Sequence, residues 1–161
     1  MKNYKIYMDV CCLNRPFDDQ TQDRVFLESE AILAVLSRCR KGEWTLTTSD
    51  VVDYELSRLT NIPKLEKIRT LSMAASERII STKETKTLAR KYQAQGVKLM
   101  DSYHLALCET HGQDVLLTTD DGFIRAVVKI ELDPKVINPD QPDLWNTGDK
   151  YNTSRPMFHR R

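Results

Sequence analysis

Short apolar runs alternate along this chain with longer segments of helical periodicity, and this alternation constrains the fold most strongly. The runs occupy about residues 4–10, 44–48, 79–80, 115–118 and 135–139. Between them, apolar residues recur every three or four positions, as on one face of a helix. Parallel strands need crossover connections, which are usually helices. We therefore expect an α/β fold with a central parallel sheet sandwiched by helices.

Capping and stop signals predict where the helices lie. Ser49 is a suitable N-cap for the helix after the second strand, and Pro63 suits the first turn of another. The first strand is expected to continue as an apolar run through residues 10–13 to a loop at 14–19. The predicted helices are one ending before Gly42, one beginning after Ser49, and those over residues 63–71, 82–95 and 99–110.

Length and composition indicate a single domain. At 161 residues the chain is long enough for one buried core and too short for two ordinary domains. The polar composition after Pro139 predicts a folded domain over residues 1–139 and a tail over 140–161 that is disordered or docked. No apolar stretch approaches the roughly 18 residues of a membrane span. The N-terminus lacks signal-peptide features, so we expect a cytoplasmic protein.

The charge balance and the cysteines exclude some functions. The net charge is only +1, so any binding of nucleic acid must depend on local basic patches. The four cysteines form no C-x-x-C pair and are interpreted as reduced, buried, small hydrophobic residues: Cys11, Cys12, Cys39 and Cys108. A thiolate nucleophile would need a nearby histidine or a basic setting.

Acidic residues stand where predicted strands end. Asp9 closes the first strand, and Asp120 follows the strand over residues 115–118. If these strands are neighbours in a parallel sheet, their carboxyl ends meet at one crevice. Asp101 begins an apolar helix and Glu55 lies within another. Four converging carboxylates would repel one another, and a bound divalent cation is the usual remedy.

Each acid also has a purely structural interpretation. Asp9 is suited to capping the following loop, and Asp101 to the positive end of a helix dipole. Glu55 is also interpretable as a surface residue, with Asp50 and Asp53 then equally good candidates. Turn chemistry accounts for one of the two adjacent aspartates that follow Thr119. The residues alone leave these alternatives open.

Together, four motifs resemble the PIN-domain ribonucleases, specifically the VapC-like toxins of type II toxin–antitoxin modules. They read IYMD at residues 6–9, SDVVDYEL at 49–56, LMDSYHLA at 99–106 and LLTTDDGF at 116–123. The acidic residues come in the family's order and on the expected elements. The resemblance covers about residues 4–139.

The resemblance implies a set of site residues. Its metal-binding and catalytic acids would be Asp9, Glu55, Asp101 and Asp120, holding Mg²⁺ or Mn²⁺, ions that prefer oxygen ligands. The implied auxiliary residues are Asn14, Thr118, Thr119 and Asp121. Candidate RNA contacts are Arg15, Lys83, Lys86, Arg90, Lys91 and Lys98, although a solvated helix face accounts equally well for the lysine-rich segment. His104 is interpreted as a packing residue, with a catalytic role as the alternative.

The resemblance also implies a function and partners. We expect a metal-dependent endoribonuclease that cleaves single-stranded RNA, a small antitoxin partner and a homodimer. The chain departs from the family pattern after Asp9, where Val10, Cys11 and Cys12 replace the usual Thr, Ser or Asn. A haloacid-dehalogenase-type phosphatase is excluded because it needs a second Asp at the position of Cys11. The remaining alternative is a non-catalytic PIN-like module that binds RNA or protein.

Overall fold

Five parallel strands form one sheet in the order β3-β2-β1-β4-β5. The fold is that of a computed structural model, which describes residues 3–141. The strands are β1 (Lys5–Met8), β2 (Thr45–Ser49), β3 (Ala75–Ile79), β4 (Val115–Leu117) and β5 (Lys135–Ile137). The predicted α/β architecture with a central parallel sheet is confirmed.

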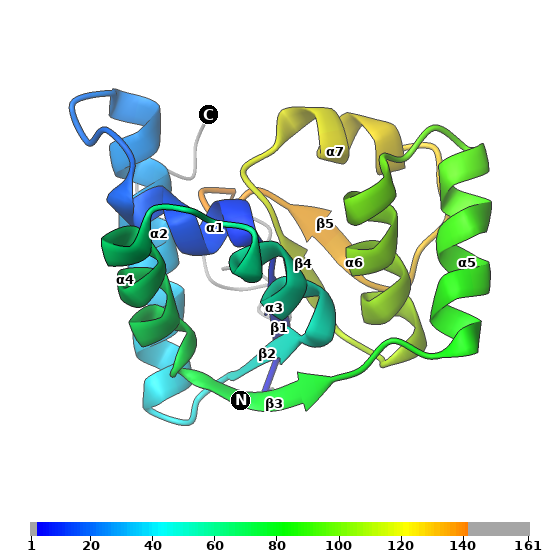
Figure 1. The fold of residues 1–161 in the computed structure, drawn as a ribbon, viewed down its shortest axis with the longest axis horizontal. Helices are drawn as coiled ribbons and strands as arrows, with labels where there is room; N and C mark the ends of the chain where they lie inside the picture. The colour runs from blue at the N-terminus through cyan, green and yellow to red at the C-terminus, as the bar shows by residue number, and fades with distance from the viewer. Residues whose placement is uncertain (1–2, 142–161) are drawn as a thin grey trace, which may run out of the picture.

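Helices cover both faces of this sheet. They are α1 (Val10–Asn14), the 3₁₀ helix η1 (Arg15–Phe17), α2 (Asp23–Arg40), α3 (Asp50–Ser57), α4 (Ile62–Ser72), α5 (Lys83–Ala94), α6 (Leu99–Thr110) and α7 (Asp121–Val127). In Figure 1, α1, α2 and α4 lie on one side of the sheet and α5 and α6 on the other. No helix in the described part is long and apolar enough to cross a membrane.

Local signals in the sequence explain where the helices start. The Ser49 hydroxyl accepts a hydrogen bond from the Val52 amide at the start of α3, and Thr82 forms a capping box with Thr85 at the start of α5. These bonds satisfy amides that have no partner inside the helix. The predicted strands and helices are therefore present, with boundaries that shift by a few residues.

The prediction for the segment after β1 is wrong. The apolar run at residues 10–13 forms α1 rather than an extension of the strand. Asp9 ends the strand in an extended conformation, and its side chain accepts a hydrogen bond from the Cys12 amide. A short apolar run fits a buried helix as well as a buried strand, so only the cap distinguishes the two.

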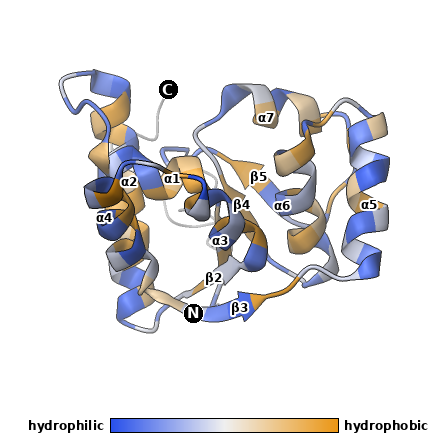
Figure 2. Ribbon diagram, in the orientation of Figure 1, coloured by the Kyte–Doolittle hydropathy of each residue, from blue (hydrophilic) through white to orange (hydrophobic). Residues whose placement is uncertain are grey.

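Apolar side chains from the strands and the helices facing them form the core. The largest fully buried side chains are Tyr7, Phe123, Ile6, Met8, Ile32, Leu36, Ile68, Leu105, Leu107, Leu116 and Leu117. Figure 2 shows hydrophobic colouring on β4 and β5 and hydrophilic colouring along much of α5. Strands buried on both faces are expected in a parallel sheet covered by helices.

The strand register brings the chain segments after β1 and β4 to one edge of the sheet. Met8 pairs with Leu117, and the Asp9 amide donates a hydrogen bond to the Leu117 carbonyl at 3.3 Å. The strand order reverses at β1, because β2 lies on one side of it and β4 on the other. Ligands of open parallel sheets bind at such a switch point, outside the carboxyl ends of the strands.

Candidate functional site

An open pocket lies beyond the carboxyl ends of β1 and β4. Four carboxylates line it although they are far apart in the sequence: Asp9, Glu55, Asp101 and Asp120. The other lining residues are Val10, Cys11, Asn14, Leu59 and His104. We call these nine residues the acidic pocket. The structure thus brings together all four acids that the sequence singled out.

Asp9 is buried, with 3% of its surface exposed. Its Oδ1 accepts hydrogen bonds from the Cys12 amide at 3.1 Å and from the Cys11 thiol at 3.0 Å. Burial raises the pKa of Asp9 above its usual range, although hydrogen bonds from Cys11, Thr118 and the Cys12 amide oppose this shift. Asp9 therefore caps the helix α1, where its structural interpretation had proposed a loop, and also lines the pocket.

Asp120 is held by the start of α7. Its Oδ1 accepts hydrogen bonds from the amides of Gly122 at 2.8 Å and Phe123 at 3.2 Å. Its own amide donates to the Thr118 hydroxyl at 3.1 Å, and that hydroxyl lies 3.5 Å from the Cys11 sulfur. The predicted auxiliary residue Thr118 therefore links the turn before α7 to α1.

Asp101 makes no side-chain hydrogen bond or ion pair within residues 3–141. It lies in the first turn of α6, but Lys98 is the N-cap residue and Asp101 has no capping contact. Burial, followed by the charges of Asp9 and Asp120, raises the pKa of Asp101 to about 6. Asp101 is therefore not a cap, although its place in the first turn of α6 suits the helix dipole. Burial and the neighbouring carboxylates nevertheless disfavour its charged form.

Glu55 is fixed by His104. The Oε1 atom of Glu55 contacts Nε2 of His104, which is 1% exposed. On the other side of the ring, Nδ1 lies 2.5 Å from the Tyr7 hydroxyl. The sequence interpretation of His104 as a packing residue therefore missed its place in the acidic pocket. Its spacing from Asp101, one helical turn, was the available signal.

The rival acids are paired outside the acidic pocket. Asp121 accepts hydrogen bonds from two nitrogens of Arg24, at 2.7 and 2.8 Å, and the guanidinium lowers the pKa of that carboxyl. Asp53 pairs with Arg78 at 2.5 Å. Asp50 accepts bonds from the amide and hydroxyl of Ser81. Geometry therefore separates Glu55 and Asp120 from their neighbours in sequence.

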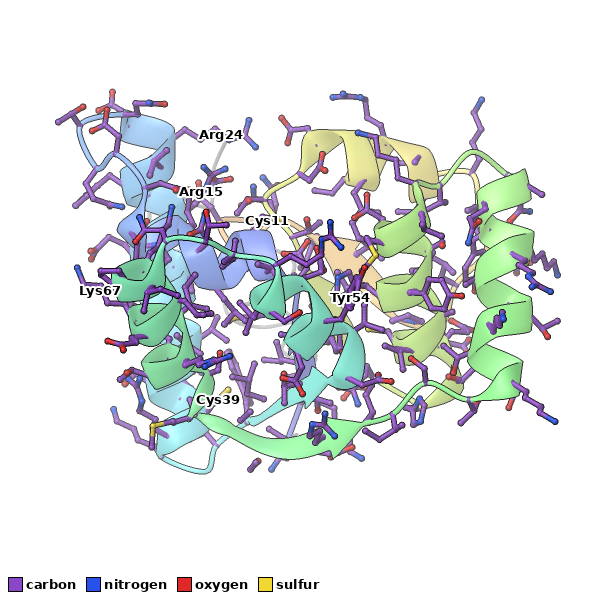
Figure 3. The ribbon with its side chains drawn as sticks, viewed as in Figure 1. Cys11, Arg15, Arg24, Cys39, Tyr54 and Lys67 are labelled. Atoms are coloured by element: carbon purple, nitrogen blue, oxygen red, sulfur yellow. The ribbon has the colours of Figure 1, made fainter. Side chains whose placement is uncertain are left out.

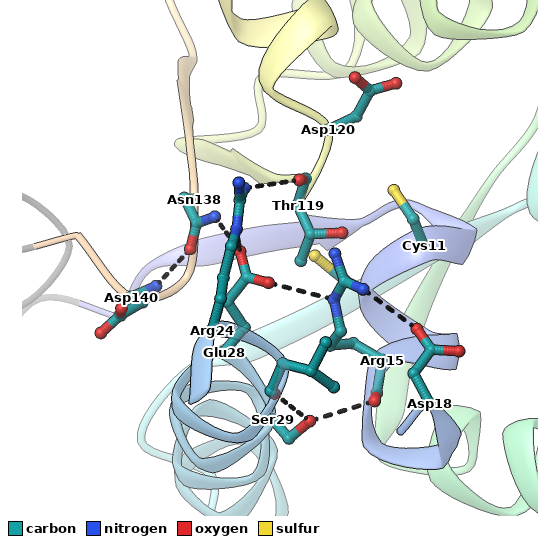
Figure 4. Close-up of polar contacts among 12 residues, drawn as sticks. Cys11, Arg15, Asp18, Arg24, Glu28, Ser29, Thr119, Asp120, Asn138 and Asp140 are labelled. Atoms are coloured by element: carbon teal, nitrogen blue, oxygen red, sulfur yellow. Dashed lines mark hydrogen bonds and ion pairs between the residues drawn. The ribbon is translucent and has the colours of Figure 1, made fainter. Parts of the chain in front are cut away.

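A buried carboxylate outside the pocket connects Arg24 and Arg15. Glu28 is 1% exposed. Its carboxylate oxygens lie 3.1 Å from Nε of Arg15 and 3.2 Å from Nε of Arg24. The carboxylate also accepts a hydrogen bond from the side-chain amide of Asn138. Arg15 also pairs with Asp18 at 3.2 Å. Figure 4 shows this network between α2, η1 and the segment after β5. Arg15, a predicted RNA contact, is therefore engaged in ion pairs that join elements of the fold.

The remaining basic candidates do not line the acidic pocket. Lys83, Lys86, Arg90 and Lys91 are exposed on α5, which packs against α6, and Lys98 lies at the start of α6. None of the five lines the pocket within the described residues. In Figure 1, α6 stands between α5 and the middle of the sheet. Their contact with RNA stays a prediction.

Three of the four cysteines are buried, as expected, and all four are free thiols. Cys11 is the exception, because it is half-buried and lines the acidic pocket; Figure 3 labels it near Arg15 and Arg24. Burial, together with the charge of Asp9, raises the pKa of the Cys11 thiol to about 12. Cys11 is thus a protonated thiol that donates to Asp9, where the sequence showed no polar helper.

The donor set of the pocket fits a hard divalent cation. Carboxylate and amide oxygens are the ligands such ions prefer, and the buried side-chain oxygen of Asn14 has no hydrogen-bond partner within the described residues. The four carboxylates stand around the pocket. No three His, Cys, Asp or Glu side chains of residues 3–141 converge into a coordinating cluster.

Comparison with known families identifies the fold. The model of the PIN domain family matches residues 6–129. The chain belongs to the PIN domain family. PIN domains are generally nucleases and are typically dependent on divalent metal. The match ends before the predicted tail, and residues 142–161 lie outside the described part of the chain.

Solved structures include a similar PIN fold. The crystal structure of VapBC2 from Rickettsia felis, bound to a DNA fragment from its promoter, contains a chain that matches with a TM-score of 0.55 and 14% identity. The match covers 83% of this chain and 98% of that one. At this identity it supports the fold alone. No curated protein matches the chain.

Proposed function

We propose that this PIN domain is a Mg²⁺- or Mn²⁺-dependent endoribonuclease that cleaves single-stranded RNA. The observation that carries the proposal is the convergence of Asp9, Glu55, Asp101 and Asp120 in one pocket. They come from four different elements, and the acids beside Glu55 and Asp120 in the sequence are paired elsewhere.

The four carboxylates of the pocket differ in how firmly the protein holds them. Asp9 and Asp120 are each held through Oδ1 by backbone amides, and Glu55 is held by His104. Asp101, which has no such partner within the described residues, has the greatest freedom to turn toward an ion. Positive charge would also relieve the repulsion that raises the pKa of Asp101.

A cation held by these carboxylates would supply Lewis acidity to the scissile phosphate and lower the pKa of a bound water. The backbone bonds at Asp9 and Asp120 keep two carboxylates fixed while substrate binds. Fixed, preorganised charges stabilise a transition state without reorganisation during the reaction. No Ser, Cys or His nucleophile is needed, and the protonated Cys11 thiol is poorly suited to that role.

Cleavage of a labelled single-stranded RNA tests this proposal. We expect the wild type to cleave with Mg²⁺ or Mn²⁺ and to stop when a chelator is added. Asp101→Asn should abolish cleavage and leave the fold intact, whereas Asp53→Asn, which lies outside the pocket, should cleave normally. Equal background activity of wild type and Asp101→Asn would reject the enzyme and favour a non-catalytic module.

We further propose that the nuclease is the toxin of a VapC-like toxin–antitoxin pair and acts on RNA in the cytoplasm. The support is the order of the four motifs and the fold shared with a chain of VapBC2. A short open reading frame beside the gene and slowed growth on expression are the expected observations. An isolated gene whose expression leaves growth unchanged would contradict the toxin role. The homodimer is tested by sedimentation.

A further inference from the structure

Behind Glu55, a chain of buried polar groups runs through the core. Ser49 Oγ lies 2.7 Å from the Tyr7 hydroxyl, which lies 2.5 Å from Nδ1 of His104. Nε2 of His104 then contacts the Glu55 carboxylate. Tyr7 and Ser49 are fully buried, and His104 is 1% exposed. Groups this deeply buried contribute stability only when their hydrogen bonds are made.

One arrangement of protons satisfies every donor in this chain. The Glu55 carboxylate accepts only, so Nε2 of His104 donates to it. Nδ1 of the neutral ring then accepts from the Tyr7 hydroxyl, and the Tyr7 oxygen accepts from Ser49. The Ser49 oxygen in turn accepts from the Val52 amide at 3.1 Å. The donors therefore all point the same way, toward Glu55.

The chain also connects different elements of the fold. Ser49 ends β2 and caps α3, and Glu55 lies within α3. Tyr7 belongs to β1 and His104 to α6. Asp9 directly follows β1, two residues after Tyr7, and Asp101 lies on α6, one turn before His104. The bonds thus fix the position of Glu55 relative to both of these acids.

We propose that His104 is a positioning residue, held in its orientation by Tyr7 and Ser49, which sets the Glu55 carboxylate for binding of a divalent cation in the acidic pocket. This inference rests on the proposed metal site. Outer-shell partners that orient a ligating carboxylate typically change metal affinity by about 10- to 100-fold when removed. Tyr7→Phe removes one hydroxyl and keeps the ring, so its effect should be smaller than that of His104→Ala.

Binding of Mn²⁺ alone, measured without RNA, tests the inference. We expect His104→Ala to raise the Kd of Mn²⁺ by about 10- to 100-fold, and His104→Gln, which keeps a side-chain N–H donor, to recover part of the loss. The matched controls are His111→Ala, at the C-cap of the same helix and outside the pocket, and Tyr92→Phe, at a buried tyrosine of α5. Both should leave the Kd unchanged.

A double-mutant cycle separates positioning from a general structural effect. If His104 acts through Glu55, His104→Ala should add little to the weakened Mn²⁺ affinity of Glu55→Ala. Additive losses would overturn the inference. So would wild-type Mn²⁺ affinity in folded His104→Ala or Tyr7→Phe, or a wild type that binds no Mn²⁺. If His104→Ala does not fold, folded Tyr7→Phe decides the outcome.

Failure of the nuclease proposal is distinguishable in the same set of variants. The wild type could cleave no RNA and still bind Mn²⁺, with an affinity that falls in His104→Ala and falls no further in the double variant with Glu55→Ala. That result would reject the nuclease and keep the positioning role. A wild type that cleaves RNA, with both Mn²⁺ affinity and cleavage unchanged in folded His104→Ala, would keep the nuclease and overturn the positioning role.

Discussion

Arg24 and Asp121 form a bidentate ion pair with N–O distances of 2.7 and 2.8 Å, while the adjacent Asp120 lines the acidic pocket. One carboxylate therefore joins α2 to α7, and its neighbour is available to the site. Arg24 and Asp121 are about half exposed, so the pair is worth at most about 1 kcal/mol of stability. This contrast separates a structural aspartate from a proposed metal ligand.

Asp120→Asn and Asp121→Asn should consequently have opposite effects. Asn is as good an N-cap as Asp, so Asp120→Asn should keep α7 and lose about 100-fold or more in RNA cleavage, through loss of a carboxylate that interacts with the cation. Asp121→Asn should retain cleavage and lower the free energy of unfolding by about 1 kcal/mol or less. Rates of cleavage and denaturant titrations measure both, and a larger loss of cleavage in Asp121→Asn would contradict the assignment.

Asp101→Asn should stabilise the metal-free protein between neutral and mildly acidic pH. The folded-state pKa of Asp101 is raised to about 6, above its usual value of 3.8. The folded state therefore keeps a proton that the unfolded state releases, and the wild type should lose stability as pH rises from about 4 to 6 and then level off. Asp101→Asn should show a smaller loss over this interval. Denaturant titrations in chelator measure the difference, and identical pH profiles would contradict it.

Mg²⁺ should raise the melting temperature of the wild type at neutral pH. An ion that binds only the folded state stabilises it in proportion to the logarithm of its concentration above Kd. The shift should be reversed by chelator and be much smaller in Asp101→Asn. Asp53→Asn, whose carboxylate pairs with Arg78, is the matched control and should keep the full shift. If Mg²⁺ raised the melting temperature equally in the wild type, Asp101→Asn and Asp53→Asn, the ion would bind outside the acidic pocket.

Cys11→Ser should preserve cleavage better than Cys11→Ala. The thiol donates to Oδ1 of Asp9 at 3.0 Å, and a serine hydroxyl replaces that donor, whereas alanine removes it. We expect Cys11→Ser to stay within several-fold of the wild type and Cys11→Ala to lose about tenfold. Tenfold corresponds to about 1.4 kcal/mol, close to the lower end for a hydrogen bond to a charged group. Steady-state cleavage at saturating Mg²⁺ measures this. Equal rates for the two variants would show that the donor is unimportant.

Much of the fold follows from local sequence signals. Alternating apolar runs and helical segments predicted the parallel sheet, and Ser49 caps a helix as predicted. The helix over Val10–Asn14 was missed because a four-residue apolar run has no period that distinguishes a buried strand from a buried helix. The Asp9 side chain decides between them through its bond to the Cys12 amide, a contact visible only in three dimensions.

The candidate site was predicted in part. The order of the acids indicated the pocket, but the choice of Glu55 over Asp53 and of Asp120 over Asp121 came from resemblance. The structural basis is the pairing of the rejected acids with Arg78 and Arg24. These pairs join residues 25 and 97 positions apart, which no local pattern encodes. The contacts of His104 were not predicted for the same reason, because its partners lie on β1 and α3.

The most direct test compares RNA cleavage by variants at the pocket acids with variants at their paired neighbours, in Mg²⁺ and in chelator. We predict that Asp9→Asn, Glu55→Gln, Asp101→Asn and Asp120→Asn lose cleavage, while Asp53→Asn and Asp121→Asn keep it, all as folded proteins. Cleavage by the wild type that persists in chelator, or that survives in Asp101→Asn, would contradict the claim that these four carboxylates form a divalent-metal nuclease site.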